Sequence, residues 1–515
     1  MQNGNDSTSG IVNGMFDRAK QVIKEMEPGI NITETGTVWH VAKGVARVKG
    51  LPGVKADELV VFPGEKYGIA FNLEPDDVSV VMLDLSDNIS SGMEVKRTGR
   101  VVDVPVGEAL LGRVVNPLGM PLDNGGDIAA TLRYPIEREA APIMDRAPVT
   151  VPLETGILAI DALIPIGKGQ RELILGDRQL GKTSVVLDTI INQKGRDVIC
   201  VYCSISQQSS GTAKFIEDLK KYGAMEYTIV VAASGDESPG MNFIAPYAAC
   251  SMGEYFMEKG KDVLIIYDDL SRHARAYREL SLLLRRPPAR EAYPGDIFYI
   301  HSRLLERATH LIPEKGGGSL TALPIIETEA QNIAAYIPTN LVSITDGQIY
   351  LSPKLFQEGI MPPVDVGKSV SRVGGQAQLP AYRQVAGDLK LSYAQFEELE
   401  IFERFSTRLD DETRRALDRG HIIREILKQP QYKPLSVTAQ VVILLCVTQG
   451  LLDGAGIKQA GEIKEKLAVF SETGIPGVKE SILAGKKLTD EEKNMIIAEA
   501  LKIIPRKKEE KNGVT

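Results

Sequence analysis

The sequence has 515 residues, a length that predicts about three domains and excludes a small module held together by disulfides. Apolar residues make up 43% of it and charged residues 25%, so the composition excludes a disordered or fibrous chain. The formal net charge of -8 has the wrong sign for a protein that binds phosphate backbones over its whole surface, so we expect no nucleic-acid partner.

The cysteines and the apolar stretches indicate where the chain works. Four cysteines in a chain of this length are typical of a reducing compartment, and the sequence does not start with the basic and apolar segments of a signal peptide. Cys200 and Cys203 lie three residues apart in an expected strand, so they face opposite ways and are interpreted as buried thiols. Residues 437–452, the most apolar stretch, fall short of the roughly 20 residues that span a bilayer. We expect the chain to face the cytosol and to reach a membrane only through partners.

The N-terminal part of the chain predicts two units. Residues 1–27 are expected to form an extension with a short amphipathic helix, because apolar residues recur in it at helical intervals. Residues 28–95 contain short runs rich in β-forming residues, separated by Gly, Pro and Asp. This spacing predicts a small β-barrel or sandwich.

Two further units follow along the chain. Residues 96–380 alternate continuous apolar runs with helical stretches, which is typical of a parallel sheet buried on both faces. The strongest strands in this region are Glu172–Gly176 and Asp262–Asp268. In residues 381–515 the strand signals disappear and apolar residues recur every three or four positions, which predicts a helical bundle.

A glycine-rich motif follows the first of these strands. It matches G-x-x-x-x-G-K-[ST] at every specified position and consists of Gly176, Asp177, Arg178, Gln179, Leu180, Gly181, Lys182 and Thr183. In a phosphate-binding loop the backbone N–H groups face the phosphates, Lys182 supplies a positive charge and the Thr183 hydroxyl reaches Mg²⁺. The alternative at this point is a glycine turn that joins a strand to a helix without binding a ligand.

Two other strand ends are expected to complete this site. Asp268 ends the second strong strand and is the candidate magnesium ligand beside Thr183, with the adjacent Asp269 as its rival. The strand that carries the cysteines is followed by Gln207, where a hydrolytic enzyme would have a carboxylate. Because an amide orients water but accepts protons poorly, this pattern favours a site that holds nucleotide with little turnover.

Nine segments, in a fixed order along the chain, carry a more specific signal. They are residues 105–119, 176–183, 267–270, 282–295, 302–307, 318–324, 335–340, 344–349 and 369–374. Through them the chain resembles the alpha subunit of the F-type ATP synthase over nearly its whole length. The resemblance implies a multidomain α/β protein with an N-terminal β-barrel, a central P-loop NTPase domain with a mainly parallel sheet, and a C-terminal α-helical bundle, within the boundaries given above.

The same resemblance implies a function and partners. It implies a regulatory, non-catalytic subunit that binds ATP or ADP with Mg²⁺, in a complex that couples ATP synthesis or hydrolysis to proton or sodium transport. Three such chains would alternate with three beta subunits around a gamma shaft, contact a peripheral stalk through the N-terminal region and meet the membrane sector indirectly. The implied location is the cytoplasmic face of a bacterial inner membrane, and the isolated chain is expected to have little or no turnover.

Individual residues acquire roles through the resemblance. Arg372 matches the arginine that reaches across the interface to the phosphates in the neighbouring beta site, where such fingers contribute roughly 10³ to 10⁵ in rate. Gln207 stands where the catalytic beta subunit has its glutamate. Gln429 and Gln431 match the loop near the adenine, where amides bond to the edges of the base. Without the resemblance, Arg372 would be interpreted as a surface ion pair and the two glutamines as loop residues.

Several positions depart from the family pattern. Relatives usually have Thr at Leu180, Arg at Met361 and a Gly-Gln-Lys/Arg type run where this chain has Ser206 and the residues after it. Loss of these polar and basic groups predicts weaker nucleotide binding. Residues 271–278 also differ from the commonest alpha pattern, which indicates a divergent bacterial branch, and His273 among them is expected to be a satisfied surface or interface histidine.

Two other functions stay open on the sequence. One is a self-sufficient hexameric P-loop ATPase, such as a secretion or RNA-translocating motor, which shares the phosphate loop and the arginine finger; Gln207 and the acidic balance disfavour it. The other is a scaffold with a vestigial pocket, suggested by Leu180, Ser206 and Met361.

Overall fold

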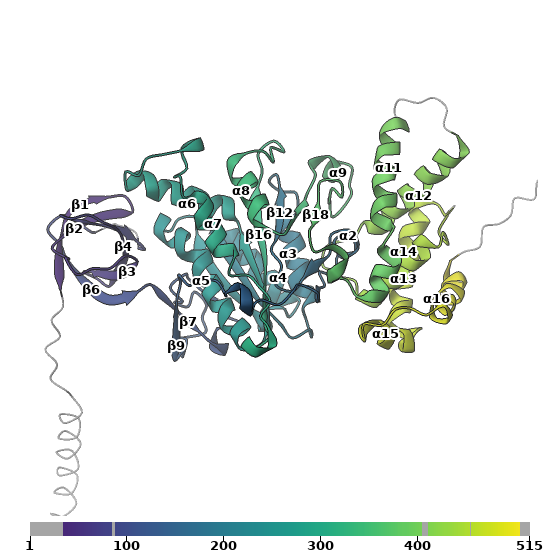
Figure 1. The fold of residues 1–515 in the computed structure, drawn as a ribbon, viewed down its shortest axis with the longest axis horizontal. Helices are drawn as coiled ribbons and strands as arrows, with labels where there is room; N and C mark the ends of the chain where they lie inside the picture. The colour runs from purple at the N-terminus through teal and green to yellow at the C-terminus, as the bar shows by residue number, and fades with distance from the viewer. Residues whose placement is uncertain (1–33, 85–87, 404–409, 454, 505–515) are drawn as a thin grey trace, which may run out of the picture.

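The computed structural model describes residues 34–84, 88–403, 410–453 and 455–504. Within them a barrel, a sheet covered by helices and a group of helices follow one another along the longest axis of the molecule (Figure 1). The helix expected within residues 1–27 lies outside the described residues.

The first unit is a closed barrel with the strand order β1-β2-β5-β4-β3-β6. All of its neighbouring strands are antiparallel, and β6 closes onto β1. The strands are β1 Thr35–Ala42, β2 Val45–Lys49, β3 Glu58–Phe62, β4 Lys66–Leu73, β5 Val78–Met82 and β6 Glu94–Val101. Buried apolar side chains, among them Val38, Val60, Phe62 and Val80, fill the interior. Of the two expected architectures, the structure therefore has the barrel.

Strand β6 carries little hydrophobic signal. Only Val95 is buried in it, and most of its other side chains are polar, so its sequence lacks a continuous apolar run. The barrel strands extend to Val101, whereas the sequence alone predicts a boundary at residue 95.

The central unit is built on an eight-stranded sheet with the order β18-β17-β12-β16-β15-β13-β14-β8. All adjacent strands are parallel except β17 and β18, which confirms the mainly parallel sheet. The strands are β8 Val114–Val115, β12 Glu172–Gly176, β13 Val198–Gln207, β14 Thr228–Ser234, β15 Asp262–Asp268, β16 Ser319–Glu327, β17 Gly347–Tyr350 and β18 Val370–Ser371. Two small antiparallel sheets flank it, formed by β7 Asp103–Val106 with β9 Leu132–Pro135 and by β10 Pro152–Leu153 with β11 Ile166–Gly167.

Helices cover both faces of the large sheet (Figure 1). One face packs against α2 Leu158–Leu163, α3 Lys182–Asn192 and α4 Ser209–Lys221. The other packs against α5 Pro239–Glu258, α6 Leu270–Leu283, α7 Ile297–Leu305 and α8 Tyr336–Ile344. Cys200 belongs to the first of these cores and Cys203 to the second, and both are buried free thiols. The prediction that they face opposite ways is confirmed.

Helices form the C-terminal unit, as predicted. They are α10 Pro380–Ala386, α11 Leu389–Glu403, α12 Asp411–Leu427, α13 Val437–Thr448, α14 Ile457–Thr473, α15 Pro476–Leu483 and α16 Asp490–Ile503. The most apolar part of the sequence forms α13, whose residues from Val437 to Val447 are all buried among the other helices. Across the parts of the chain that the structure describes, no helix combines the length and the apolar character needed to cross a membrane.

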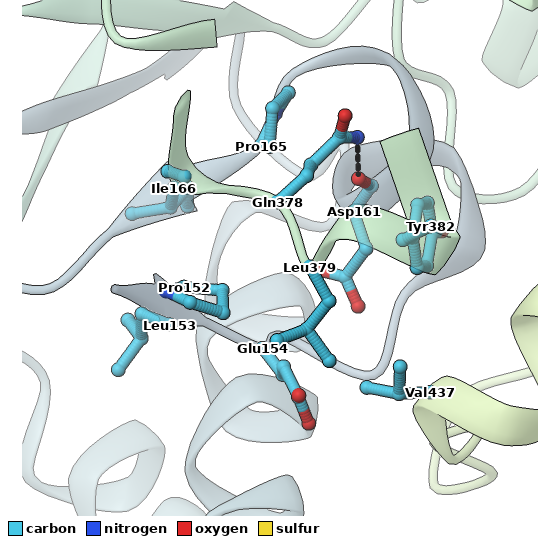
Figure 2. A pocket seen from close by; sticks show the side chains of 11 residues that line it. Pro152, Leu153, Glu154, Asp161, Pro165, Ile166, Gln378, Leu379, Tyr382 and Val437 are labelled. Atoms are coloured by element: carbon cyan, nitrogen blue, oxygen red, sulfur yellow. Dashed lines mark hydrogen bonds between the residues drawn. The ribbon is translucent and has the colours of Figure 1, made fainter. Parts of the chain in front are cut away.

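A buried polar network joins the central unit to these helices. The Asp161 carboxylate accepts hydrogen bonds from Thr155 and, over 2.8 Å, from Gln440 Nε2, while the Tyr382 hydroxyl donates to Gln440 Oε1 over 2.6 Å. Beside it, Gln378 Nε2 donates to the Asp161 carbonyl over 2.8 Å (Figure 2). Because each polar group is paired inside a shared apolar core, the junction is fixed in one arrangement.

Candidate functional site

The predicted strand, loop and helix are present in that order. Strand β12 ends at Gly176, the loop turns back, and α3 begins at Lys182. Gly181 precedes the helix with φ of 93°, in the left-handed region that side chains other than glycine adopt only with strain. The first turn of α3 presents its backbone N–H groups to the space above the loop, which suits an anion.

Lys182 is held inside the loop. Its Nζ donates hydrogen bonds to the carbonyl oxygens of Gly176 and Asp177, each over 2.7 Å. Burial lowers the pKa of Lys182, although nearby carboxylates oppose this effect. The loop therefore fixes a compact positive charge at the point where phosphate oxygens would lie.

Asp268 lies next to the loop, at the end of β15. Its Oδ2 accepts hydrogen bonds from Thr183 Oγ1 over 3.1 Å and from the Tyr202 hydroxyl over 2.8 Å. Asp268 is only 4% exposed, and burial raises its pKa despite these bonds. The predicted pairing of Asp268 with the threonine of the loop is thus present in the geometry.

Asp269 has a different task. Its Oδ1 accepts a hydrogen bond from the backbone N–H of Arg272 over 2.7 Å and so caps the N-terminus of α6. Of the two rivals, Asp268 is the one directed at the loop. Its carboxylate and the Thr183 hydroxyl provide hard oxygen donors, and Mg²⁺ is commonly bound by one or two such groups together with phosphate oxygens. The donor set therefore fits Mg²⁺.

Gln207 lies at the end of β13 and bonds to the same carboxylate. Its Nε2 donates to Asp268 Oδ1 over 3.1 Å, so both oxygens of Asp268 are engaged. Gln207 is half-buried and lies beside the cavity that opens next to the loop. An amide in this position can donate to a carboxylate or a phosphate, but it cannot remove a proton from water.

The remaining polar residues of the loop support its shape. Asp177 Oδ1 accepts hydrogen bonds from Thr328 Oγ1 over 2.6 Å and from the Gln331 backbone N–H over 3.1 Å. Arg178 is exposed and pairs with Glu327 over 3.0 Å. These contacts tie the loop to the end of β16, so Asp177 and Arg178 hold the backbone of the loop in place.

A cavity of about 370 Å³ adjoins the loop on the side of α3. It is largely apolar and is lined by Ile157, Gln179, Leu180, Gly181, Ser184, Val185, Asp188, Phe356, Met361, Pro362, Pro363, Gln429, Pro430 and Gln431. Its position beside the phosphate loop and its largely apolar walls suit a purine base. Burial raises the pKa of Asp188, its acidic residue, to about 6.

The two glutamines at this cavity differ in their contacts. Gln429 is buried, and its amide bonds to the Leu158 backbone N–H over 3.1 Å and to the carbonyl oxygens of Gly156 and Lys433 over 2.7 and 2.8 Å. Gln431 is exposed, and its side chain has no hydrogen bond to another described residue. Gln429 thus fixes the loop, and Gln431 is the glutamine whose amide faces the cavity unpaired.

Comparison with known proteins identifies the family. The ATP synthase alpha/beta family matches through its nucleotide-binding domain at residues 156–371, its C-terminal domain at 378–503 and its beta-barrel domain at 32–99. The chain belongs to the ATP synthase alpha/beta family. This membership accounts for the barrel, the sheet and the helical bundle in that order.

Similar proteins within the family are alpha subunits. ATP synthase subunit alpha 2 of Syntrophus aciditrophicus is 60% identical over 94% of this chain and 93% of that protein. Subunit alpha 1 of Rhodopirellula baltica is 59% identical over 92% and 94%, and subunit alpha 2 of Polaromonas naphthalenivorans is 63% identical over 82% and 81%. The resemblance to the alpha subunit is confirmed, and the self-sufficient hexamer is not the main interpretation.

Arg372 lies far from the phosphate loop of its own chain. It follows β18, and β18 pairs with the start of β17, which pairs with the start of β12, whereas the phosphate loop follows the end of β12. Its backbone N–H donates to the Asp346 carbonyl over 2.9 Å, and its side chain is exposed. The structure therefore does not bring Arg372 to the phosphate loop of the same chain.

His273 corrects one expectation. It is fully buried between α5 and α7 instead of lying at a surface, and it stacks on Phe243. Its Nδ1 lies 3.3 Å from His301 Nε2 and its Nε2 lies 2.9 Å from the Phe243 carbonyl oxygen. The position belongs to the buried face of α6, together with Leu270, Ala274 and Tyr277.

Tyr202 is a site residue that the sequence analysis missed. It lies in β13 between the two cysteines, where an apolar run gives no functional signal. Its hydroxyl reaches Asp268 only because β13 and β15 are adjacent parallel strands, so the sheet order is needed to find it. A tyrosine within the apolar first part of this strand was the one available hint.

Proposed function

We propose that this chain is the regulatory, non-catalytic alpha subunit of a rotary F-type ATP synthase. It binds Mg-ATP or Mg-ADP without turning it over and donates Arg372 to the catalytic site of an adjacent beta subunit. Family membership and the alpha subunits among its relatives support the assignment to this complex. The remaining points rest on the geometry of the site.

The single observation that carries the non-catalytic assignment is the amide at the end of β13. Gln207 is fixed by its bond to Asp268, beside the loop where the terminal phosphate would lie. Hydrolysis needs a group that orients water and takes its proton, and an amide supplies only the first of these. Bound nucleotide therefore stays intact and serves to hold the domain in one conformation.

Different residues of the site would contact different parts of the nucleotide. Lys182 and the N-terminus of α3 hold phosphate oxygens, and Thr183 and Asp268 hold the magnesium ion, which supplies positive charge against the phosphates. Gln431 and the apolar walls of the cavity hold the base. Gly176, Gln179, Leu180 and Gly181 shape the loop around this arrangement.

The position of Arg372 supports its action in trans. Its guanidinium is exposed at an edge strand of the sheet and, among the described residues, makes no ion pair or hydrogen bond. In the proposed complex, three copies alternate with three beta subunits around a gamma shaft, the N-terminal region contacts the peripheral stalk, and the membrane sector is reached indirectly. This complex would lie at the cytoplasmic face of a bacterial inner membrane and would transport protons or sodium ions.

The proposal is tested with the purified chain and with the assembled complex. We expect the chain alone to bind Mg-ATP with no saturable hydrolysis, and we expect Lys182→Ala to abolish this binding while Lys214→Ala, a surface lysine of α4, leaves it unchanged. Saturable ATP hydrolysis by the chain alone would contradict the regulatory assignment. Absence of Mg-ATP binding by the wild-type chain would instead support a scaffold with a vestigial pocket.

A further inference from the structure

Glu172 is a buried carboxyl group that the nucleotide site does not use. It is the first residue of β12, at the opposite end of this strand from the phosphate loop, and it is fully buried. Its Oε2 accepts a hydrogen bond from Gln170 Nε2 over 2.7 Å, whereas Oε1 has no partner among the described residues. Leaving a buried oxygen unpaired is costly, so a hydrogen-bond donor or a cation that came close to Oε1 would be stabilised.

The register of three strands places this carboxyl group beside Ser371, the residue before Arg372. Glu172 lies opposite Gly347 of β17, and Gly347 lies opposite Ser371 of β18. A Cβ atom at Gly347 would overlap both Glu172 Oε2 and the Val370 carbonyl oxygen. The glycine therefore leaves the space through which the carboxyl group approaches the strand that carries the arginine.

Hydrogen bonds fix the backbone of this strand from two sides. Gln170 Nε2 also contacts Ser371 Oγ at 3.4 Å, and Ser371 Oγ donates to the Pro165 carbonyl over 2.7 Å. On the other side the Arg372 backbone N–H donates to Asp346. The Arg372 side chain has no such restraint within the described part of the chain, so its position depends on the charges around it.

Three charged side chains from different parts of the chain act on Glu172: those of Asp346, Arg372 and Lys390. Burial and the nearby Asp346 carboxylate raise the pKa of Glu172 well above its usual value. Arg372 and Lys390 of α11 act in the opposite direction, together with the hydrogen bond from Gln170. Asp346 itself is paired with Arg171 over 2.7 Å. Arg372 is therefore one of two cations that respond to the charge of Glu172, and the other lies on a different unit of the protein.

We propose that Glu172 is a positioning residue for Arg372, an inference that rests on the proposed role of Arg372 in trans. When Glu172 is ionised, its unpaired Oε1 attracts the guanidinium and draws it back toward its own chain. When Glu172 takes up a proton from solvent, Gln170 still holds the carboxyl group, but the guanidinium is released toward the phosphates of the neighbouring beta site. The charge of Glu172 thus sets the fraction of time that the Arg372 guanidinium spends at the neighbouring beta site.

The test is the pH dependence of ATP hydrolysis by the complex assembled with beta and gamma subunits. In wild type we expect kcat to fall as pH rises and Glu172 ionises, by up to about 10²-fold if the guanidinium moves by an ångström or more. Glu172→Gln is always neutral and should lack this fall, with Mg-ATP binding to this chain unchanged. A Glu172→Gln profile that follows the wild-type profile would overturn the proposal.

A second variant keeps the proposal testable if Glu172→Gln does not assemble. Lys390→Gln removes a cation that lowers the pKa of Glu172, so the fall in kcat should move to higher pH, while Lys487→Gln on the surface should leave it in place. No shift in Lys390→Gln would overturn the role of Glu172. Arg372→Ala separates the two hypotheses: undiminished kcat in that variant refutes the finger itself, whereas a large loss with no effect of Glu172→Gln or Lys390→Gln refutes only the positioning role.

Discussion

Gln207 donates its Nε2 hydrogen to Asp268 Oδ1 over 3.1 Å, at the edge of the sheet where the phosphate loop lies. The same carboxylate accepts hydrogen bonds from Thr183 and Tyr202. Its negative charge is therefore shared among three neutral donors in the interior of the protein. At position 207, a neutral hydrogen-bond donor should therefore stabilise the fold more than a second negative charge would.

Gln207→Glu should destabilise the chain in the absence of ligand. The change places a second carboxylate beside buried Asp268 and removes a donor, which should lower the free energy of unfolding by about 1–3 kcal/mol. Mg-nucleotide should reduce this difference, because a cation between the carboxylates offsets their repulsion. Thermal unfolding with and without Mg-ATP measures both effects. Gln207→Met, which removes the donor without adding charge, is the control, and equal stability of the two variants would contradict the charge argument.

Arg372→Ala should slow ATP hydrolysis by the assembled complex by roughly 10³ to 10⁵, because the arginine would no longer stabilise the transferring phosphoryl group. Mg-ATP binding to this chain should not change, since Arg372 and the phosphate loop lie at opposite ends of their strands. Single-turnover kinetics and equilibrium binding separate the two quantities. Arg100→Ala, an exposed arginine of the barrel, should have wild-type rates. Loss of nucleotide binding in Arg372→Ala would show that the arginine serves its own chain.

The two glutamines of the base cavity should differ in what they stabilise. Gln429→Ala leaves the backbone groups of Gly156, Leu158 and Lys433 without their partner and should lower the free energy of unfolding by about 1–3 kcal/mol. Gln431→Ala breaks no described hydrogen bond and should weaken nucleotide binding with little change in stability. Denaturant unfolding and calorimetric binding give the two readouts. The opposite assignment of effects would show that Gln429 faces the base.

Much of the fold could be predicted from local pattern. The continuous apolar runs of β12 and β15 indicate strands buried on both faces, and the glycine motif between a strand and a helix indicates the phosphate loop. Strand β6 could not be found in this way because one face is polar and only Val95 is buried. Its identity as a barrel strand depends on hydrogen bonds to β1 and β3, which are contacts between distant segments.

Less of the candidate site than of the fold could be predicted from local sequence pattern. Asp268 and Asp269 are adjacent in sequence, and only the hydrogen bond of Asp269 to the start of α6 separates a helix cap from a candidate metal ligand. The different tasks of Gln429 and Gln431 likewise depend on which one lies beneath the loop. In both cases the residue type was informative, and the direction of the side chain came from tertiary packing.

The pair of buried histidines should make the protein sensitive to acid. Burial lowers the pKa of His273 to about 4 from 6.5, and it lowers the pKa of His301 well below its usual value. At pH values between the lowered pKa of the folded protein and the ordinary pKa of about 6.5, the unfolded chain binds more protons than the folded chain. The free energy of unfolding therefore falls as pH decreases below about 6.5. Urea unfolding of wild type and His273→Gln across this pH range measures the loss of stability. The variant should lose less stability on acidification, and parallel curves for the two proteins would exclude a contribution from His273.

The cavity that Gln429 and Gln431 line should bind nucleotide more tightly when Met361 is replaced by arginine. None of the cavity-lining residues in the described structure is Lys or Arg, whereas Asp188 is acidic. Met361 is 37% exposed, and its backbone carbonyl accepts the hydrogen bond from Gln429, so the side chain can change without disturbing the loop. A guanidinium over a purine contributes about 0.5–1 kcal/mol, which predicts a two- to fivefold lower Kd. Calorimetry of Mg-ATP binding to Met361→Arg tests this, with Met361→Gln as the uncharged control. Equal affinity of the two variants would indicate that the apolar walls and Gln431 alone determine the affinity for the base.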